Sequence, residues 1–121
     1  MFKHILVPLD GSAFSEEALS YALSLADQYG SQLTLMQVIM PAQWMSMLEA
    51  ETPEMVDRIR SANESKATTY MKEKVAHLKA QGYRVTAEVR ESEPIAEAIL
   101  GVADAGDADT IVMCTHGRSG I

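Results

Sequence analysis

Short apolar runs along the chain predict four β-strands. Residues 5–7 form the first run, and Pro8 ends it because proline cannot donate to a sheet ladder. Residues 32–39 predict a second strand. Over residues 83–90 apolar and polar positions alternate, which is typical of an edge strand with one solvated face. Residues 111–113 (Ile-Val-Met) are too few for a helix and too continuously apolar for a half-exposed strand, so we expect a parallel strand buried on both faces.

Between these runs, apolar residues recur at helical spacing. Ser15, followed by two glutamates, is expected to cap the first helix, which Gly30 ends. A long helix is predicted from about Glu54 to Gln81, and a third helix carries Pro94 in its first turn and stops at Gly106. The apolar stripes consist of Ala18, Leu19, Ala22, Leu25, Ala26 and Tyr29, of Ala67, Met71, Val75 and Leu78, and of Ile95, Ile99 and Val102.

The alternation of strands and helices predicts an α/β protein. Right-handed crossovers between such elements give a Rossmann-like open parallel sheet with helices on both faces, a three-layer α/β/α arrangement. We expect the strands at residues 5–8 and 109–114 to be neighbours in this sheet. The 121 residues, 47% of them hydrophobic, are enough for a single domain spanning residues 1–121 with a sizeable core.

Composition excludes several classes of partner. A formal charge of −7 without a cluster of Lys and Arg argues against nucleic acid and against an anionic membrane surface. Cys114 is the only cysteine, so no intrachain disulfide and no multi-cysteine metal site is available. The chain has neither an N-terminal signal peptide pattern nor a membrane-spanning run. We therefore expect a soluble, cytoplasmic protein with no metal site.

Two stretches that follow strands contain candidate ligand-binding residues. Asp10 follows the first strand, and residues 114–120 turn abruptly from apolar to small, polar and glycine residues. In open α/β sheets ligands bind where the strand order reverses, at the carboxyl edge. A carboxylate there can accept hydrogen bonds from ribose hydroxyls, and main-chain groups near Val38 can contact a base edge. Equally, Asp10 can simply close an Asx-turn, and residues 114–120 can be an ordinary turn.

The segment from Met40 to Leu48 is rich in methionine around Trp44. Such residues form either an adaptable binding surface or the cover of a core edge, and the second is the commoner case.

No pair of residues supports nucleophilic catalysis. His4 and His77 lie at a strand start and in an exposed helix stretch, where structural roles are expected. His116 lies in the candidate loop without an evident partner, and Cys114 is more simply a small buried residue than a reactive thiol. The His-x-Gly-His signature of nucleotidyl transferases and the paired acidic residues of receiver domains are absent. Turnover beyond slow ATP hydrolysis is therefore not expected.

Three stretches, "HILVPLDGS", "LTLMQVIMP" and "ADTIVMCTHGRSGI", resemble the universal stress protein family, and the resemblance covers the whole chain in order. It implies a cytoplasmic stress-response or signalling module, often a homodimer, that binds ATP, AMP or ADP, with Mg²⁺ as an accompanying ion. By position, Asp10 matches the ribose-contacting aspartate, Val38 the residue whose main chain meets adenine, and Gly117 the second glycine of the phosphate motif. The nucleotide-binding residues that the resemblance implies are Pro8, Leu9, Asp10, Val38, Met113, Cys114, His116, Gly117, Arg118 and Gly120.

The chain departs from this family pattern in two places. Cys114 occupies the position of the first glycine of the phosphate motif, and the sequence contains no distal Gly-Ser or Gly-Thr pair. The family's fifth strand and last helix are also missing, so we expect a domain that is truncated or lacks its tail. With fewer phosphate contacts, ATP should bind no better than about tenfold over AMP. A nucleotide-independent dimeric interaction protein of the same fold is the alternative function.

Overall fold

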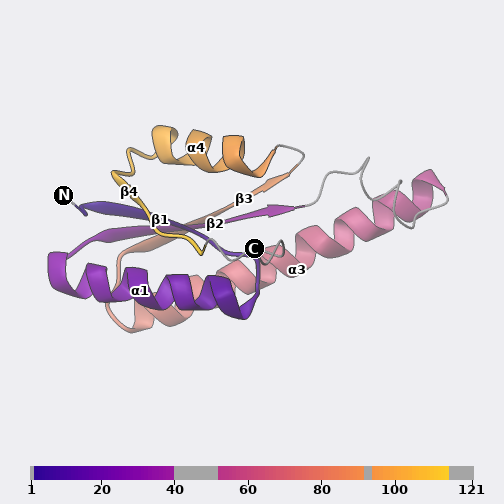
Figure 1. Cartoon of the computed structure of the whole chain (residues 1–121). Coiled ribbons are helices and arrows are strands. Elements are labelled where there is room, and N and C mark those ends of the chain that lie inside the picture. The colour runs from indigo at the N-terminus through magenta and orange to yellow at the C-terminus, as the bar shows by residue number, and fades with distance from the viewer. Residues whose placement is uncertain (1, 40–51, 92–93, 115–121) are drawn as a thin grey trace.

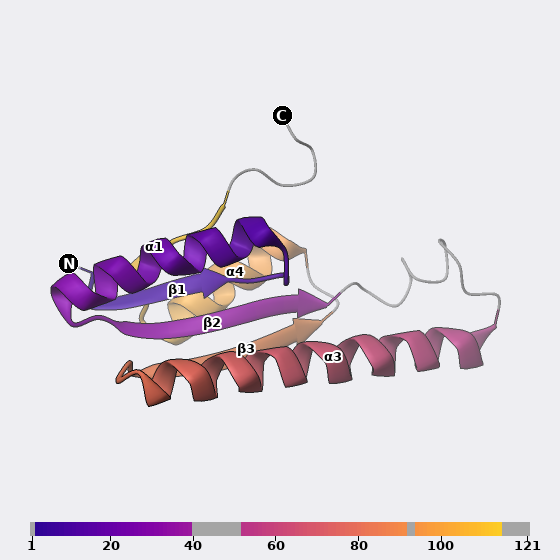
Figure 2. The ribbon, with the colours of Figure 1, turned by 90° about the horizontal axis from the view of Figure 1, so that it is seen from below.

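The computed structural model describes residues 2–39, 52–91 and 94–114. In these ranges the chain forms a parallel sheet between layers of helices, which confirms the predicted three-layer α/β/α class (Figures 1 and 2). The elements in chain order are β1 (His4–Pro8), α1 (Ala13–Tyr29), β2 (Gln32–Ile39), α3 (Pro53–Ala80), β3 (Val85–Glu91), α4 (Ile95–Ala105) and β4 (Thr110–Ile111).

The described sheet has four parallel strands in the order β3-β2-β1-β4. Ile5 of β1 stands opposite Leu33 of β2 on one side and Thr110 of β4 on the other. The predicted neighbourhood of the first and last strands is therefore confirmed. Because all four strands run the same way, the carboxyl ends of β1, β2 and β4 lie at one edge of the sheet.

Two apolar layers hold the sheet in place. On one face, Val7 and Leu35 pack with Leu19 of α1 and Met71 of α3, and both strand residues are fully buried. On the other face, Leu6 and Met36 pack against α4 through a stripe of Ala98, Ile99, Val102 and Ala103. Figure 1 shows α1 and α3 below the sheet and α4 above it. The two-sided burial explains why β1 and β2 are continuous apolar runs in the sequence.

Two of the predicted helix starts are wrong in detail. Ser12, not Ser15, caps α1, and its side chain accepts a hydrogen bond from the Ser15 amide at 3.2 Å. Ser15 is instead a buried residue of the first turn, where its hydroxyl donates to the Ser12 carbonyl. Pro94 precedes α4 as its N-cap rather than lying in the first turn. The predicted stop at Gly30 is confirmed, since this residue adopts a left-handed φ of 68° and its N–H donates to Ala26.

The expectation that residues 111–113 are buried on both faces is wrong. Ile111 is 36% exposed and Met113 46% exposed. β4 contains only Thr110 and Ile111, although the Val112 N–H still donates to the Leu6 carbonyl at 3.0 Å. The reason is position, because in the described part of the chain β4 pairs with β1 alone and so forms an edge of the sheet.

The methionine-rich segment around Trp44 lies outside the described residues. Among the helices that the structure describes, none combines the length and the apolar character needed to cross a membrane.

Candidate functional site

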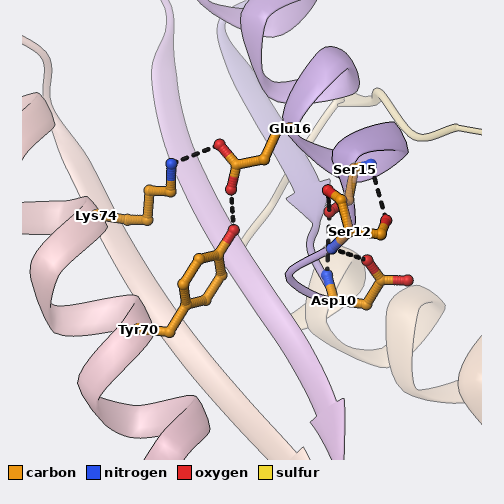
Figure 3. Close-up of polar contacts among 6 residues, drawn as sticks. All are labelled: Asp10, Ser12, Ser15, Glu16, Tyr70 and Lys74. Atoms are coloured by element: carbon orange, nitrogen blue, oxygen red, sulfur yellow. Dashed lines mark hydrogen bonds and ion pairs between the residues drawn. The ribbon is translucent and has the colours of Figure 1, made fainter.

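The loop between β1 and α1 is built by short-range hydrogen bonds (Figure 3). The Asp10 carboxylate accepts the Ser12 N–H at 2.9 Å, and the Asp10 N–H donates to the Ser15 hydroxyl at 3.3 Å. Gly11 lies between them with φ of 85°, a backbone conformation that favours glycine. Asp10 is therefore an Asx-turn residue, one of the two roles considered from the sequence, and the turn holds its exposed carboxylate at the sheet edge.

Hydrogen bonding keeps the Asp10 carboxylate charged. The Ser12 side chain lowers the pKa of Asp10 most, and the Ser12 amide and Ser15 hydroxyl lower it further. Partial burial works in the opposite direction, but the pKa stays below the usual aspartate value. At neutral pH the site thus presents a hydrogen-bond acceptor with a full negative charge.

A cavity of about 340 Å³ opens beside this loop. The structure brings together six of the residues predicted to bind nucleotide, since the cavity is lined by Pro8, Leu9, Asp10, Val38, Met113 and Cys114. The other four predicted residues, His116, Gly117, Arg118 and Gly120, lie outside the described residues. The candidate site is therefore described on its β1, β2 and α4 sides and at the start of the segment that follows β4.

Six further lining residues were not predicted: Ser12, Phe14, Ser15, Met36, Ile95 and Ile99. Met36 has a signal in the sequence, because it lies two residues before Val38 and so on the same face of β2. Ile95 and Ile99 lie four apart on α4, a spacing that predicts one buried helix face but not what that face covers. The α4 contribution becomes visible only once the helix is placed over the sheet.

The main chain of Val38 has no strand partner on the β1 side among the described residues. Along β2, alternate residues bond toward β1, as when the Gln32 N–H donates to Lys3 and the Met36 carbonyl accepts from Leu9 at 2.7 Å. Val38 is the next residue in this series, but β1 has already ended at Pro8. The Val38 N–H and carbonyl therefore point past the end of β1, at the cavity wall.

A cluster of three polar side chains joins α1 to α3 next to the loop (Figure 3). Glu16, in the first turn of α1, accepts hydrogen bonds from the Tyr70 hydroxyl and from the Lys74 ammonium. The Lys74 ammonium also lies 5.7 Å from the centre of the Tyr70 ring. This contact fixes the start of α1, and with it the Asp10 turn, relative to α3.

The Glu16 cluster should make stability depend on pH. Burial raises the pKa of Glu16, but the hydrogen bonds from Lys74 and Tyr70 outweigh burial and hold it below the usual glutamate value of about 4.3. Between the pKa of Glu16 in the folded protein and its higher pKa in the unfolded chain, the unfolded chain binds more protons. The stabilisation by the Glu16 carboxylate is therefore present above about pH 4.3 and is lost as pH falls through the pKa of Glu16 in the folded protein. In urea denaturation between neutral pH and about pH 3, the gap in unfolding free energy between wild type and Glu16→Gln should therefore shrink toward acid.

Glu17→Gln is the matched control for this experiment, because Glu17 is exposed and makes no ion pair with another described residue. The assigned role of the Glu16 carboxylate would be contradicted if the difference in unfolding free energy between wild type and Glu16→Gln stayed constant over the whole pH range.

The histidines that the structure describes do not face this cavity. The His4 ring is 2.7 Å from the Thr34 hydroxyl at the amino end of β1, opposite the candidate site. His77 is exposed on α3. These two positions are consistent with the structural roles expected for them.

Comparison with known proteins places the chain in a family. The model of the Universal stress protein family matches residues 1–121. A universal stress protein of Methanocaldococcus jannaschii is 25% identical over 121 residues, which are 100% of this chain and 69% of that protein.

Solved structures agree with this match. A universal stress family protein from Burkholderia pseudomallei superposes with a TM-score of 0.80 at 26% identity, covering 98% of this chain and 85% of that one. A family protein from Arabidopsis thaliana with AMP bound has a TM-score of 0.68 at 15% identity and covers 97% of this chain and 79% of its own. The chain therefore belongs to the universal stress protein family.

Proposed function

We propose that this protein is an adenine-nucleotide-binding module with a stress-response or signalling role. The observation that carries the proposal is the cavity at the carboxyl edge of the sheet, where the Asp10 carboxylate and the Val38 main chain lie on an otherwise largely apolar wall. The AMP bound to the family protein from Arabidopsis thaliana supports the same class of ligand.

The cavity walls suit a flat, largely apolar base. Leu9, Met36 and Ile99 are buried residues that line it, and Ile95 adds an apolar rim. Adenine carries a donor and an acceptor side by side on its Watson–Crick edge. The Val38 carbonyl and N–H, both directed past the end of β1, form the complementary acceptor and donor pair.

Asp10 is suited to the ribose. One carboxylate oxygen accepts the Ser12 N–H, which leaves the second oxygen to accept from the ribose hydroxyls. The same side chain thus closes the turn and binds the sugar, so the two roles weighed for Asp10 are compatible.

The described part of the site does not include a positively charged phosphate-binding residue. None of the described lining residues is a Lys or Arg, so the described residues fit an adenosine moiety and supply no cation for phosphates. The role of His116, Gly117, Arg118 and Gly120 toward phosphates and Mg²⁺ stays a prediction from the sequence, as does any preference for ATP over AMP.

The proposal predicts discrimination against inosine. In the base of IMP a carbonyl replaces the 6-amino group and N1 carries a hydrogen, so the acceptor and the donor of this edge exchange places. The Val38 carbonyl would then face an acceptor and the Val38 N–H would face a donor. Isothermal titration should show AMP binding about tenfold tighter than IMP, a difference of about 1.4 kcal/mol. Equal affinities for AMP and IMP would refute the proposal that the Val38 main chain contacts the base edge.

Titration of AMP, ADP and ATP against the folded protein also tests the alternative function. If none of the three nucleotides binds, the result favours the alternative function, a nucleotide-independent interaction protein. The apolar surface of Tyr21, Ile111 and Met113, which are 66%, 36% and 46% exposed, is the observation that favours that alternative.

A further inference from the structure

The outer edge of β3 presents unpaired backbone groups. β3 pairs with β2 alone among the strands that the structure describes. The Leu33 N–H donates to the Arg84 carbonyl at 2.8 Å, so the ladder uses alternate β3 residues beginning with Arg84. The N–H and carbonyl groups of the residues in between, Val85, Ala87 and Val89, point away from β2 to the open edge.

A groove runs along this edge between β3 and α3. Figure 2 shows α3 lying alongside β3. A cavity of about 540 Å³ there has an apolar floor that includes Met71, Val75 and Val85. A second hollow of about 440 Å³ adjoins it and shares Thr68, Lys72 and Val89 as lining residues. The groove therefore extends for several residues beside the unpaired strand edge.

The groove lies in the basic part of an acidic protein. Eight of the ten Lys and Arg residues, but only three of the 17 Asp and Glu residues, fall within residues 58–90. One acidic residue, Glu64, lines the second hollow, and the flanking Asp57 and Glu91 pair with Arg60. Lys72 and Lys79 are exposed, lie two helical turns apart and line the groove. Neither makes an ion pair with another residue in the described ranges.

We propose that the α3–β3 groove docks an extended acidic segment of a partner protein, which adds to the sheet as a strand beside β3. The backbone of the segment would bond with Val85, Ala87 and Val89, and its apolar side chains would contact the groove floor. Its carboxylates would pair with Lys72 and Lys79, which sets a preference for acidic sequences.

The observations favour this occupant over two others. A second copy of the chain related by a two-fold axis would bring its own Lys72 and Lys79 to the same junction, so like charges would meet. Single-stranded nucleic acid binds on aromatic stacking platforms, and no aromatic residue is among the described residues that line either hollow.

Fluorescence anisotropy with a labelled ten-residue peptide tests the proposal; valine and glutamate alternate at its odd positions, which share the face toward α3, and threonine fills its even positions. The double variant Lys72→Glu/Lys79→Glu should weaken binding of this peptide about tenfold or more. Arg58→Glu/Lys66→Glu is the matched control, because it also reverses two charges on the same helix, at exposed residues outside the groove, and it should change affinity by less than about twofold. A peptide with lysine in place of glutamate should bind at least about tenfold more weakly.

Ala87→Pro tests the backbone part of the interaction. The lost N–H points to the open edge, so pairing with β2 is kept while an added strand is blocked. Melting temperatures establish that each variant is folded. Alternating-residue N-methylation of the peptide removes the same hydrogen bonds without changing the protein, and should abolish binding.

Three results would overturn the proposal. The first is absence of binding at about 1 mM peptide, a concentration that half-fills a site with a Kd of about 1 mM. The second is equal binding of the glutamate, lysine and N-methylated peptides. The third is a different occupant, seen either as self-association in sedimentation that Ala87→Pro removes, or as displacement of the peptide by an RNA oligomer.

Discussion

Replacing Asp10 with asparagine is expected to weaken AMP binding by about 1–3 kcal/mol while leaving the protein folded. Asparagine keeps the side-chain oxygen that accepts the Ser12 N–H, so the Asx-turn survives. The substitution removes the negative charge and replaces the second carboxylate oxygen, which would accept from the ribose hydroxyls, with an NH2 group. Isothermal titration with AMP measures the loss, and a melting curve shows whether the turn is intact.

Asp104→Asn is the matched control, since Asp104 is exposed on α4 and does not line the cavity. Its affinity for AMP should equal that of wild type. Asp10→Ala removes both the charge and the turn, so it should lose affinity and thermal stability together. Unchanged affinity in a folded Asp10→Asn protein would refute the ribose assignment.

Replacing Leu35 with alanine should lower the free energy of unfolding by about 2–5 kcal/mol. Leu35 is fully buried in the middle of β2 and belongs to the core that joins α1 and α3 to the sheet. Truncation removes apolar contacts and leaves a cavity that the two helices, held by their other contacts, fill only in part. Urea denaturation monitored by circular dichroism measures this change.

Leu100→Ala provides the comparison, because Leu100 is 59% exposed on α4 and the chemical change is the same. It should alter the unfolding free energy by no more than about 0.5 kcal/mol. Similar losses for the two variants would mean that α1 and α3 do not form the core layer described for this face.

Local sequence patterns were sufficient for most of the elements. Residues 32–39 were predicted as a strand and are β2, and the predicted helix over residues 54–81 differs from α3 by one residue at each end. These predictions succeed because burial on one helix face or on both sheet faces imposes a periodicity that is visible in the chain. Ser12 and Ser15 both carry a hydroxyl that can cap a helix, and only the backbone geometry shows that the cap is Ser12. The prediction therefore placed the cap at Ser15.

The candidate site was predicted in part. Asp10 and Val38 were placed at one sheet edge from the strand order, and the structure places both on one cavity wall. Ile95 and Ile99 were missed, since helical spacing does not say which part of a sheet a helix covers. The basic groove was missed as well, because its two cations, Lys72 and Lys79, are separated along α3 and form no continuous run.

The sequence by itself determined most of the secondary structure, the α/β class and the family. Each of these depends on residues close together in the chain or on motifs that follow one another in a fixed order. Tertiary structure alone decided that residues 111–113 lie at a sheet edge, that α4 closes the cavity, and that Lys72 and Lys79 line a groove beside unpaired backbone. Burial, cavities and charge clusters arise from pairs of elements packed together, and such long-range pairing leaves no periodic signal within either element alone.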